Sequence, residues 1–215
     1  IDQMSKFDPR PAAIAALPPR AELITAIKDL RTEKRERKAA KEDGADRAEQ
    51  QSNSYRKAVR DQYVAAVDAR LAVALGSRQD FAERLVHFWA NHFAISIDKI
   101  VTVGLAGNFE FDAIRPHIFG RFADLLKAAS WHPAMLLYLD QAQSIGPNSM
   151  LAQRIGARRN REIGLNENLA REILELHTLG DRTAYSQADV TEFARAMTGL
   201  TVGGLGERRL QRVLG

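Results

Sequence analysis

The sequence predicts an all-α protein, an irregular bundle of several helices with a protruding polar arm near residues 31–55. Three observations support this fold class. Apolar residues recur at the three- and four-residue spacings of a helix along most of the chain. Capping residues precede these patterns, and glycines follow them. Strand patterns do not recur; only residues 94–108, which contain several isoleucines and valines, could form either a strand or a packed loop.

The N-terminal part of the chain alternates between proline-rich, amphipathic and polar segments. Four prolines make the first 20 residues irregular, and the last two of them, Pro18 and Pro19, suit the start of a helix. Helix-forming residues continue over residues 31–51 without an apolar stripe. This segment is therefore either a polar helix in water or a disordered hairpin tip. The stripe returns in residues 54–75, and Gly76 ends that helix.

Helix boundaries are clearer in the rest of the chain. Two Ser-x-x-Asp capping boxes predict that helices start after Ser77 and Ser186. Pro116 and Pro133 indicate two further helix starts between them. Gly180 ends the helix that begins near residue 166. The elements therefore follow one another as helices joined by loops.

Composition sets limits on the class of protein. The chain of 215 residues is long enough to bury a core, and we expect a single helical domain over residues 1–215. No apolar run is long enough to cross a membrane. The sequence has no cysteine, which excludes disulfides and thiolate metal sites, and we expect neither a metal nor a cofactor.

Basic residues are concentrated in two stretches, and the net charge is +4. The stretch at residues 31–41 is interleaved with glutamates, which indicates a solvated helix face. The stretch at residues 154–161 has no aromatic residue that could stack on a base. These features argue against nucleic-acid binding, although the second stretch could attract a polyanion through charge alone.

Three predicted helices each carry an ionisable residue on their apolar side. At about 100° per residue, Glu172 falls within an apolar arc. That arc contains Leu165, Leu169, Leu176 and Leu179. His92 falls within the arc formed by Phe81, Leu85, Phe88 and Trp89. Arg70 lies on the apolar face of residues 54–75. Because an isolated buried charge is costly, we expect Arg70 and His92 to approach Glu172 in a shared dry interior.

Two interpretations of this trio remain open. A structural ion network that sets the helix packing would place these groups inside, and so would a functional cluster. In the second case Glu172 or Glu175 would act as a base, and His92 would position the substrate together with Asn168. A zinc site is not predicted, because His87 and His92 diverge around their helix.

Five sequence motifs occur in order between residues 81 and 201. They are Phe88-Trp89-Ala90-Asn91-His92-Phe93, His132-Pro133-Ala134-Met135-Leu136-Leu137-Tyr138-Leu139-Asp140, Pro147-Asn148-Ser149, Asn166-Glu167-Asn168-Leu169-Ala170-Arg171-Glu172 and Tyr185-Ser186-Gln187-Ala188-Asp189-Val190. Together they resemble the motifs of the bacterial "domain of unknown function 1800" family. The polar segment that precedes them is similar to that family's variable region.

The resemblance implies a largely helical bacterial protein in a periplasmic or secreted setting, because many members carry export signals. Members are typically much longer, so we expect residues 1–215 to be an N-terminal portion. The family has no established activity and supplies no catalytic residue. Together with Arg70, the motif positions that could bind a ligand or partner are Asn91, Asp140, Asn148, Asn168 and Arg171.

Two functions from different classes follow. The leading hypothesis is a non-catalytic helical module that binds a partner protein or organises an envelope assembly, because no catalytic motif is recognisable. The alternative is a hydrolase-type enzyme with a buried polar site made of Glu172, His92 and Arg70. The oligomeric state is not predicted.

Overall fold

The computed structural model describes residues 4, 6–26, 28–29, 32, 45–150, 152–153 and 164–203. Within these ranges the chain consists of helices and loops without a strand, which confirms the predicted all-α class. The predicted polar arm lies outside the described residues up to residue 44, apart from residue 32, and continues as helix from Ala45. The chain divides into two compact units, unit 1 (residues 1–125) and unit 2 (residues 126–215). The prediction of a single domain stays a prediction.

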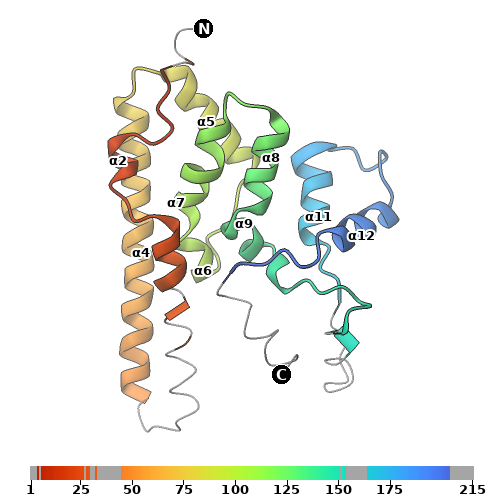
Figure 1. Ribbon diagram of the computed structural model, residues 1–215. Coiled ribbons are helices and arrows are strands. Elements are labelled where there is room, and N and C mark those ends of the chain that lie inside the picture. Colours follow the sequence, from red (N-terminus) through yellow and green to blue (C-terminus); the bar gives the residue numbers. More distant parts are fainter. Residues whose placement is uncertain are drawn as a thin grey trace. The chain divides into compact units, whose positions relative to one another are not determined.

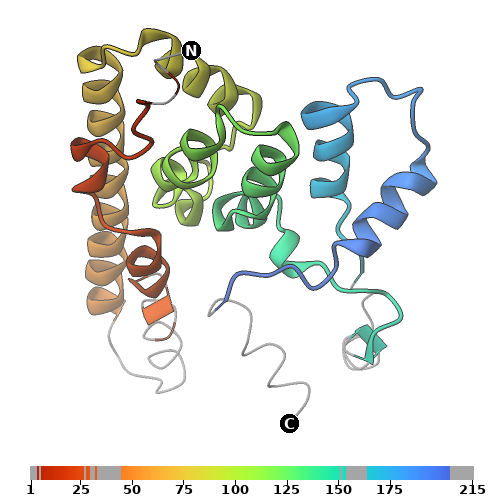
Figure 2. The same ribbon diagram turned by 45° about the horizontal axis from the view of Figure 1, so that its top comes forward.

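Unit 1 is organised around one long helix (Figures 1 and 2). Its elements are α2 (Ala12–Ala15), α4 (Ala45–Gly76), α5 (Asp80–His92), α6 (Ile100–Val103), α7 (Ala106–Asn108), the π-helix η1 (Phe109–Ile114) and the 3-10 turn η2 (Arg115–His117). The short helices α2, α6 and α7 all contact α4. Residues 94–108 thus contain short helices, and the interpretation of this stretch as a strand is wrong.

One hydrophobic core cluster of unit 1 forms where α2 and η1 meet the C-terminal half of α4. Its buried residues are Ile14, Ala66, Ala69, Val73 and Phe111, with Leu17 packed against them. Ala66, Ala69 and Val73 recur on α4 at three- and four-residue spacings, as expected for one buried stripe. The long helix therefore contributes a continuous apolar face to this core.

Helix α5 buries a different face from the one that its apolar pattern predicts. Its buried residues are Ala82, Glu83 and Val86, whereas Phe81 and Phe88 are 62% and 59% exposed. The predicted capping box at Ser77 is also wrong. Gln79 is the N-cap, and the Ser77 hydroxyl accepts a hydrogen bond from the Gln79 N–H at 3.0 Å.

Unit 2 is built from shorter helices. Its elements are α9 (Pro133–Tyr138), η3 (Gln141–Gln143), α11 (Asn168–Glu172), the π-helix η4 (Ile173–Thr178) and α12 (Gln187–Ala196), and α8 (Phe122–Trp131) crosses the boundary between the units. The predicted capping box of Ser186 with Asp189 is confirmed. Gly180 ends η4 with φ +72°, a conformation that glycine adopts at little cost.

The π-helix changes which residues of the α11–η4 segment are buried. Leu169, Ile173 and His177, spaced four apart, are buried. The wider turn of a π-helix keeps residues four apart in line better than an α-helix does. Leu176 and Leu179, which the sequence placed on the inward arc, are 63% and 52% exposed.

No helix in the described part of the chain is long and apolar enough to span a membrane.

Candidate functional site

Arg70 on α4 pairs with a carboxylate of its own unit. Its Nε lies 2.7 Å from Oε2 of Glu110, which belongs to η1. The Arg70 side chain is 38% exposed, whereas that of Glu110 is 8% exposed. The ion pair therefore joins a surface guanidinium to a nearly buried carboxylate.

His92, at the end of α5, packs among aromatic rings. Its ring centroid lies 5.4 Å from that of Trp89, 4.6 Å from Phe93 and 6.5 Å from Phe122. The residue is half-buried, and the neighbouring Asn91 is exposed. His92 is thus a member of an aromatic cluster at the end of its helix.

Glu172 closes α11 and is half-buried. Burial first, and then the charge of Glu175, raises the pKa of the Glu172 carboxyl. Among the described residues it forms neither an ion pair nor a hydrogen bond through its side chain. Within the part of the chain that the structure describes, it is thus a carboxylate without a paired cation, on a segment that exposes Leu176 and Leu179.

The expectation of a dry interior shared by Arg70, His92 and Glu172 needs correction. None of the three residues is fully buried, and the ion-pair partner of Arg70 is Glu110. Periodicity identifies the apolar arc of a helix, but the neighbouring helices determine which side is covered. For this reason the predicted burial of the three side chains was wrong. The approach of Arg70 and His92, in unit 1, to Glu172, in unit 2, stays a prediction.

The fully buried ion pair of unit 1 involves two residues that the sequence did not single out. Arg115 donates two hydrogen bonds of 2.8 Å to the carboxylate oxygens of Glu83, and a third of 3.1 Å to the Pro9 carbonyl. The guanidinium also lies 5.3 Å from the centre of the Phe7 ring. The sequence signal for Glu83 is its position between Ala82 and Val86, the other buried residues of α5. That signal is readable only when the buried side of α5 is known.

Glu110 lies in the electrostatic field of this pair as well as beside Arg70. Burial is the largest influence and raises the pKa of Glu110, against the opposing charges of Arg70 and Arg115. Burial also lowers the pKa of the His87 imidazole, helped by the charge of Arg70. Unit 1 thus holds two glutamates, two arginines and a histidine that influence one another.

The raised pKa of Glu110 predicts the effect of Glu110→Gln. A glutamate whose folded-state pKa exceeds its unfolded pKa destabilises the fold above the folded pKa, and this penalty is relieved as the pH falls through it. At about pH 7 the free energy of unfolding of the neutral variant should therefore be no lower than that of the wild type. As the pH falls towards about 4, the free energy of unfolding of the wild type should rise relative to that of the variant. Urea unfolding across this range tests this. A loss above roughly 1 kcal/mol at neutral pH would contradict it.

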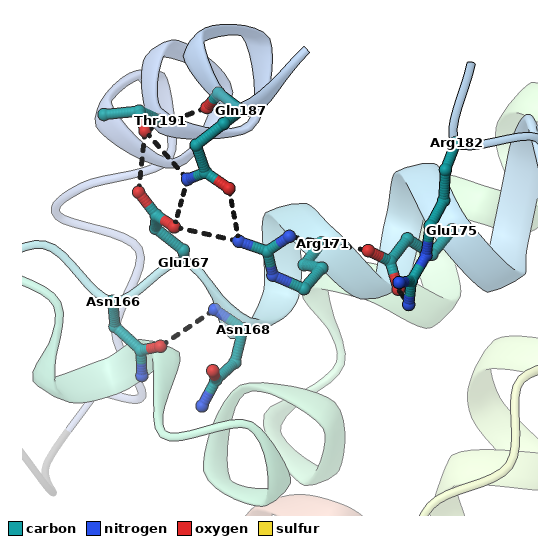
Figure 3. A network of polar contacts seen from close by, with 8 residues as sticks. All are labelled: Asn166, Glu167, Asn168, Arg171, Glu175, Arg182, Gln187 and Thr191. Atoms are coloured by element: carbon teal, nitrogen blue, oxygen red, sulfur yellow. Dashed lines mark hydrogen bonds and ion pairs between the residues drawn. The ribbon is translucent and has the colours of Figure 1, made fainter. Parts of the chain in front are cut away.

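Glu167 is the centre of a polar network between α11 and α12 (Figure 3). Its Oε1 accepts a 2.7 Å hydrogen bond from the Thr191 hydroxyl, and its Oε2 accepts one of 2.8 Å from the Gln187 amide. Arg171 donates to the same Oε2 at 3.1 Å. The hydrogen bonds, that from Thr191 first, hold the pKa of Glu167 below its usual range. The network ties the start of α11 to the first turns of α12.

A second part of the network neutralises Glu175. Arg171 lies 3.4 Å from its Oε1, and Arg182 donates a 2.8 Å hydrogen bond to its Oε2 (Figure 3). Arg171 also donates a 2.9 Å hydrogen bond to Oε1 of the Gln187 side chain. Both arginines are thus occupied by partners other than Glu172. Glu175 is thus held in two salt bridges, and its role as a candidate base stays a prediction.

The remaining motif residues anchor loops. Asn166 donates a 2.9 Å hydrogen bond to the Leu139 carbonyl and accepts one of 3.0 Å from the Asn168 N–H. Asp140 has φ +57° and accepts a 3.2 Å hydrogen bond from the Gln143 amide. The Asn148 side chain is exposed. No group of three His, Asp or Glu residues in the described ranges is arranged to hold a metal ion.

The described part of the chain is thus an all-helical protein whose motif residues form a glutamate- and arginine-centred network. The chain belongs to the family described as "Protein of unknown function (DUF1800)", whose sequence model matches residues 4–213. This confirms the family resemblance. Neither the curated proteins nor the solved structures include a match to the chain.

Proposed function

We propose that the chain is a non-catalytic helical module that binds a partner protein through one face of the α11–η4 helix. This Glu172 face consists of Asn168, Glu172 and Leu176, which are spaced four apart, and of Leu179 just beyond the π-helix. The observation that carries the proposal is the exposure of both leucines on a helix that the sequence predicts to be amphipathic. An amphipathic helix gains stability when its apolar face is covered by a partner.

The polar network supports this function, because a binding surface works best on a rigid element. Glu167 and Arg171 join α11 to α12, and Arg182 joins η4 to the following loop. A preorganised face loses little conformational entropy on binding, which favours affinity.

The hydrolase alternative receives less support from the geometry. It requires Arg70 and His92 beside Glu172, whereas Arg70 pairs with Glu110 and His92 packs on Trp89. The raised pKa of Glu172 is consistent with a general acid. It is equally consistent with a carboxylate that forms an ion pair only in the complex with a partner protein. Because the resemblance implies an exported family, we propose that the partner is a protein of the bacterial envelope.

Site-specific cross-linking tests the function. A photo-reactive residue at Leu176 should capture one discrete protein in the native host cell, whereas the same residue at the exposed polar Thr183 should not. The purified partner should then bind the wild-type chain, and Leu176→Ser should weaken that binding roughly tenfold, as expected for a central apolar anchor. Equal capture at both positions, or a partner that binds Leu176→Ser normally, would refute the proposal.

A further inference from the structure

The Glu172 face combines apolar side chains with a carboxylate that has no ion-pair partner among the described residues. Glu172 is half-buried, and Leu176 stands one turn further along the helix. The neighbouring carboxylate Glu175 already has two arginine partners. Arg171 and Arg182 are thereby directed to Glu175, Glu167 and Gln187, as Figure 3 shows for the residues that it labels.

We propose that the partner segment is an amphipathic helix that places a lysine or arginine opposite Glu172 and apolar residues opposite Leu176 and Leu179. This inference rests on the proposed function and specifies the chemistry of the partner. Charge complementarity carries it. A partly desolvated carboxylate is costly when alone, and a cation in the covering surface offsets that cost.

The geometry of the face sets the form of the partner. Asn168, Glu172 and Leu176 are spaced four apart along the segment, and Leu179 follows just beyond the π-helix, so the face covers roughly three helical turns. A partner helix presents side chains at three- and four-residue spacings. A lysine or arginine on it that is flanked by leucines at i±3 or i±4 can therefore contact Glu172 while the leucines contact the apolar part of the face. The aliphatic stem of a lysine or arginine can lie on Leu176 while its charged end reaches Glu172.

A protein helix fits this face better than an anionic membrane surface. Glu172 stands among the exposed leucines, and Asp181 is exposed just beyond Gly180. Negative charges beside an apolar patch repel anionic lipid headgroups, whereas membrane-surface helices carry cations on their polar side. The Glu172 carboxylate would therefore repel an anionic membrane surface, whereas it attracts a basic helix.

Three synthetic helical peptides of about 14 residues, roughly four turns, test the inference. They share one leucine stripe and differ at a single position within it, which holds lysine, glutamine or glutamate. Dissociation constants for the whole chain are measured by fluorescence anisotropy. The lysine peptide should bind about fivefold more tightly than the glutamine peptide, the glutamate peptide should bind most weakly, and Glu172→Gln should abolish the difference between lysine and glutamine.

The outcomes separate this inference from the function on which it rests. Leu176→Ser should weaken all three peptides, while Leu75→Ser, at an exposed leucine of unit 1, should weaken none. If Leu176→Ser weakens the peptides but lysine and glutamine bind equally, the inferred cation is refuted and the binding face stands. If no peptide binds, or if Leu176→Ser has no effect, both proposals fail. Tighter binding to vesicles of phosphatidylcholine and phosphatidylglycerol than to the lysine peptide would overturn the choice of a protein helix.

Discussion

Replacing Arg115 by methionine should lower the free energy of unfolding of unit 1 by about 3–5 kcal/mol. The Arg115 side chain is 1% exposed and that of Glu83 is 7% exposed, so the substitution leaves a carboxylate buried without its cation. It also removes the hydrogen bond to the Pro9 carbonyl, which holds the N-terminal segment. The loss is measured by urea unfolding that follows Trp89 fluorescence, in a Trp131→Phe background that removes the other tryptophan.

A surface ion pair of unit 1 provides the matched control. Arg121 donates two hydrogen bonds to Asp124, at 2.9 and 3.1 Å, but its side chain is 83% exposed. Arg121→Met should therefore cost less than about 1 kcal/mol. Replacing Glu83 and Arg115 together by methionine should recover most of the lost stability, because no charge is then left buried. Equal losses for Arg115→Met and Arg121→Met would show that burial of the pair is unimportant.

Gly107→Ala should be the most destabilising glycine-to-alanine change in the described part of unit 1, with a loss of about 1–3 kcal/mol. A Cβ at position 107 would lie 2.4 Å from the Cβ of Ala66 and 3.2 Å from the Phe111 ring. Both neighbours belong to the packed core, so α7 would have to move away from α4. Urea unfolding in the same tryptophan background measures the loss.

The sign of this effect separates packing from helix propensity. Alanine is a better helix former than glycine, so propensity alone predicts that both Gly107→Ala and Gly76→Ala stabilise. A Cβ at Gly76 would meet no atom within 4 Å, and Gly76→Ala should be neutral or stabilising. Adding Ala66→Gly to Gly107→Ala should relieve the clash and restore part of the stability. A stabilising Gly107→Ala variant would refute the close packing of the two helices.

Local sequence signals predicted the helices themselves well. Ser186 and Asp189 form the predicted capping box, and Gly180 has the positive φ of a helix terminator. The helix predicted at Pro133 also starts there, and its N-cap is His132, whose Nδ1 accepts a 3.2 Å hydrogen bond from the Ala134 N–H. These contacts form between residues two or three apart, so the local sequence is sufficient to specify them.

The same type of signal failed where a competing contact was available. Ser77 has the spacing of a capping box with Asp80, but its hydroxyl accepts from the Gln79 N–H and the helix starts after Gln79. In the α11–η4 segment an α-helical repeat was assumed, and the π-helix instead buried His177 and exposed Leu176. A single change of helical pitch thus altered which residues the candidate site presents.

The amino-acid sequence by itself determined that the chain is helical, where several helices start and stop, and which family it belongs to, because caps, periodicity and motifs are properties of neighbouring residues. Only the tertiary structure decided which side of each helix is buried and which charges pair. The ion pair of Glu83 with Arg115 joins residues 32 apart in the sequence. The ion pair of Glu110 with Arg70 joins residues 40 apart, from the residue numbers 110 and 70. The packing of the helices determines which residues form such ion pairs, because burial and Coulomb energy depend on distances in space and not on separation in the sequence.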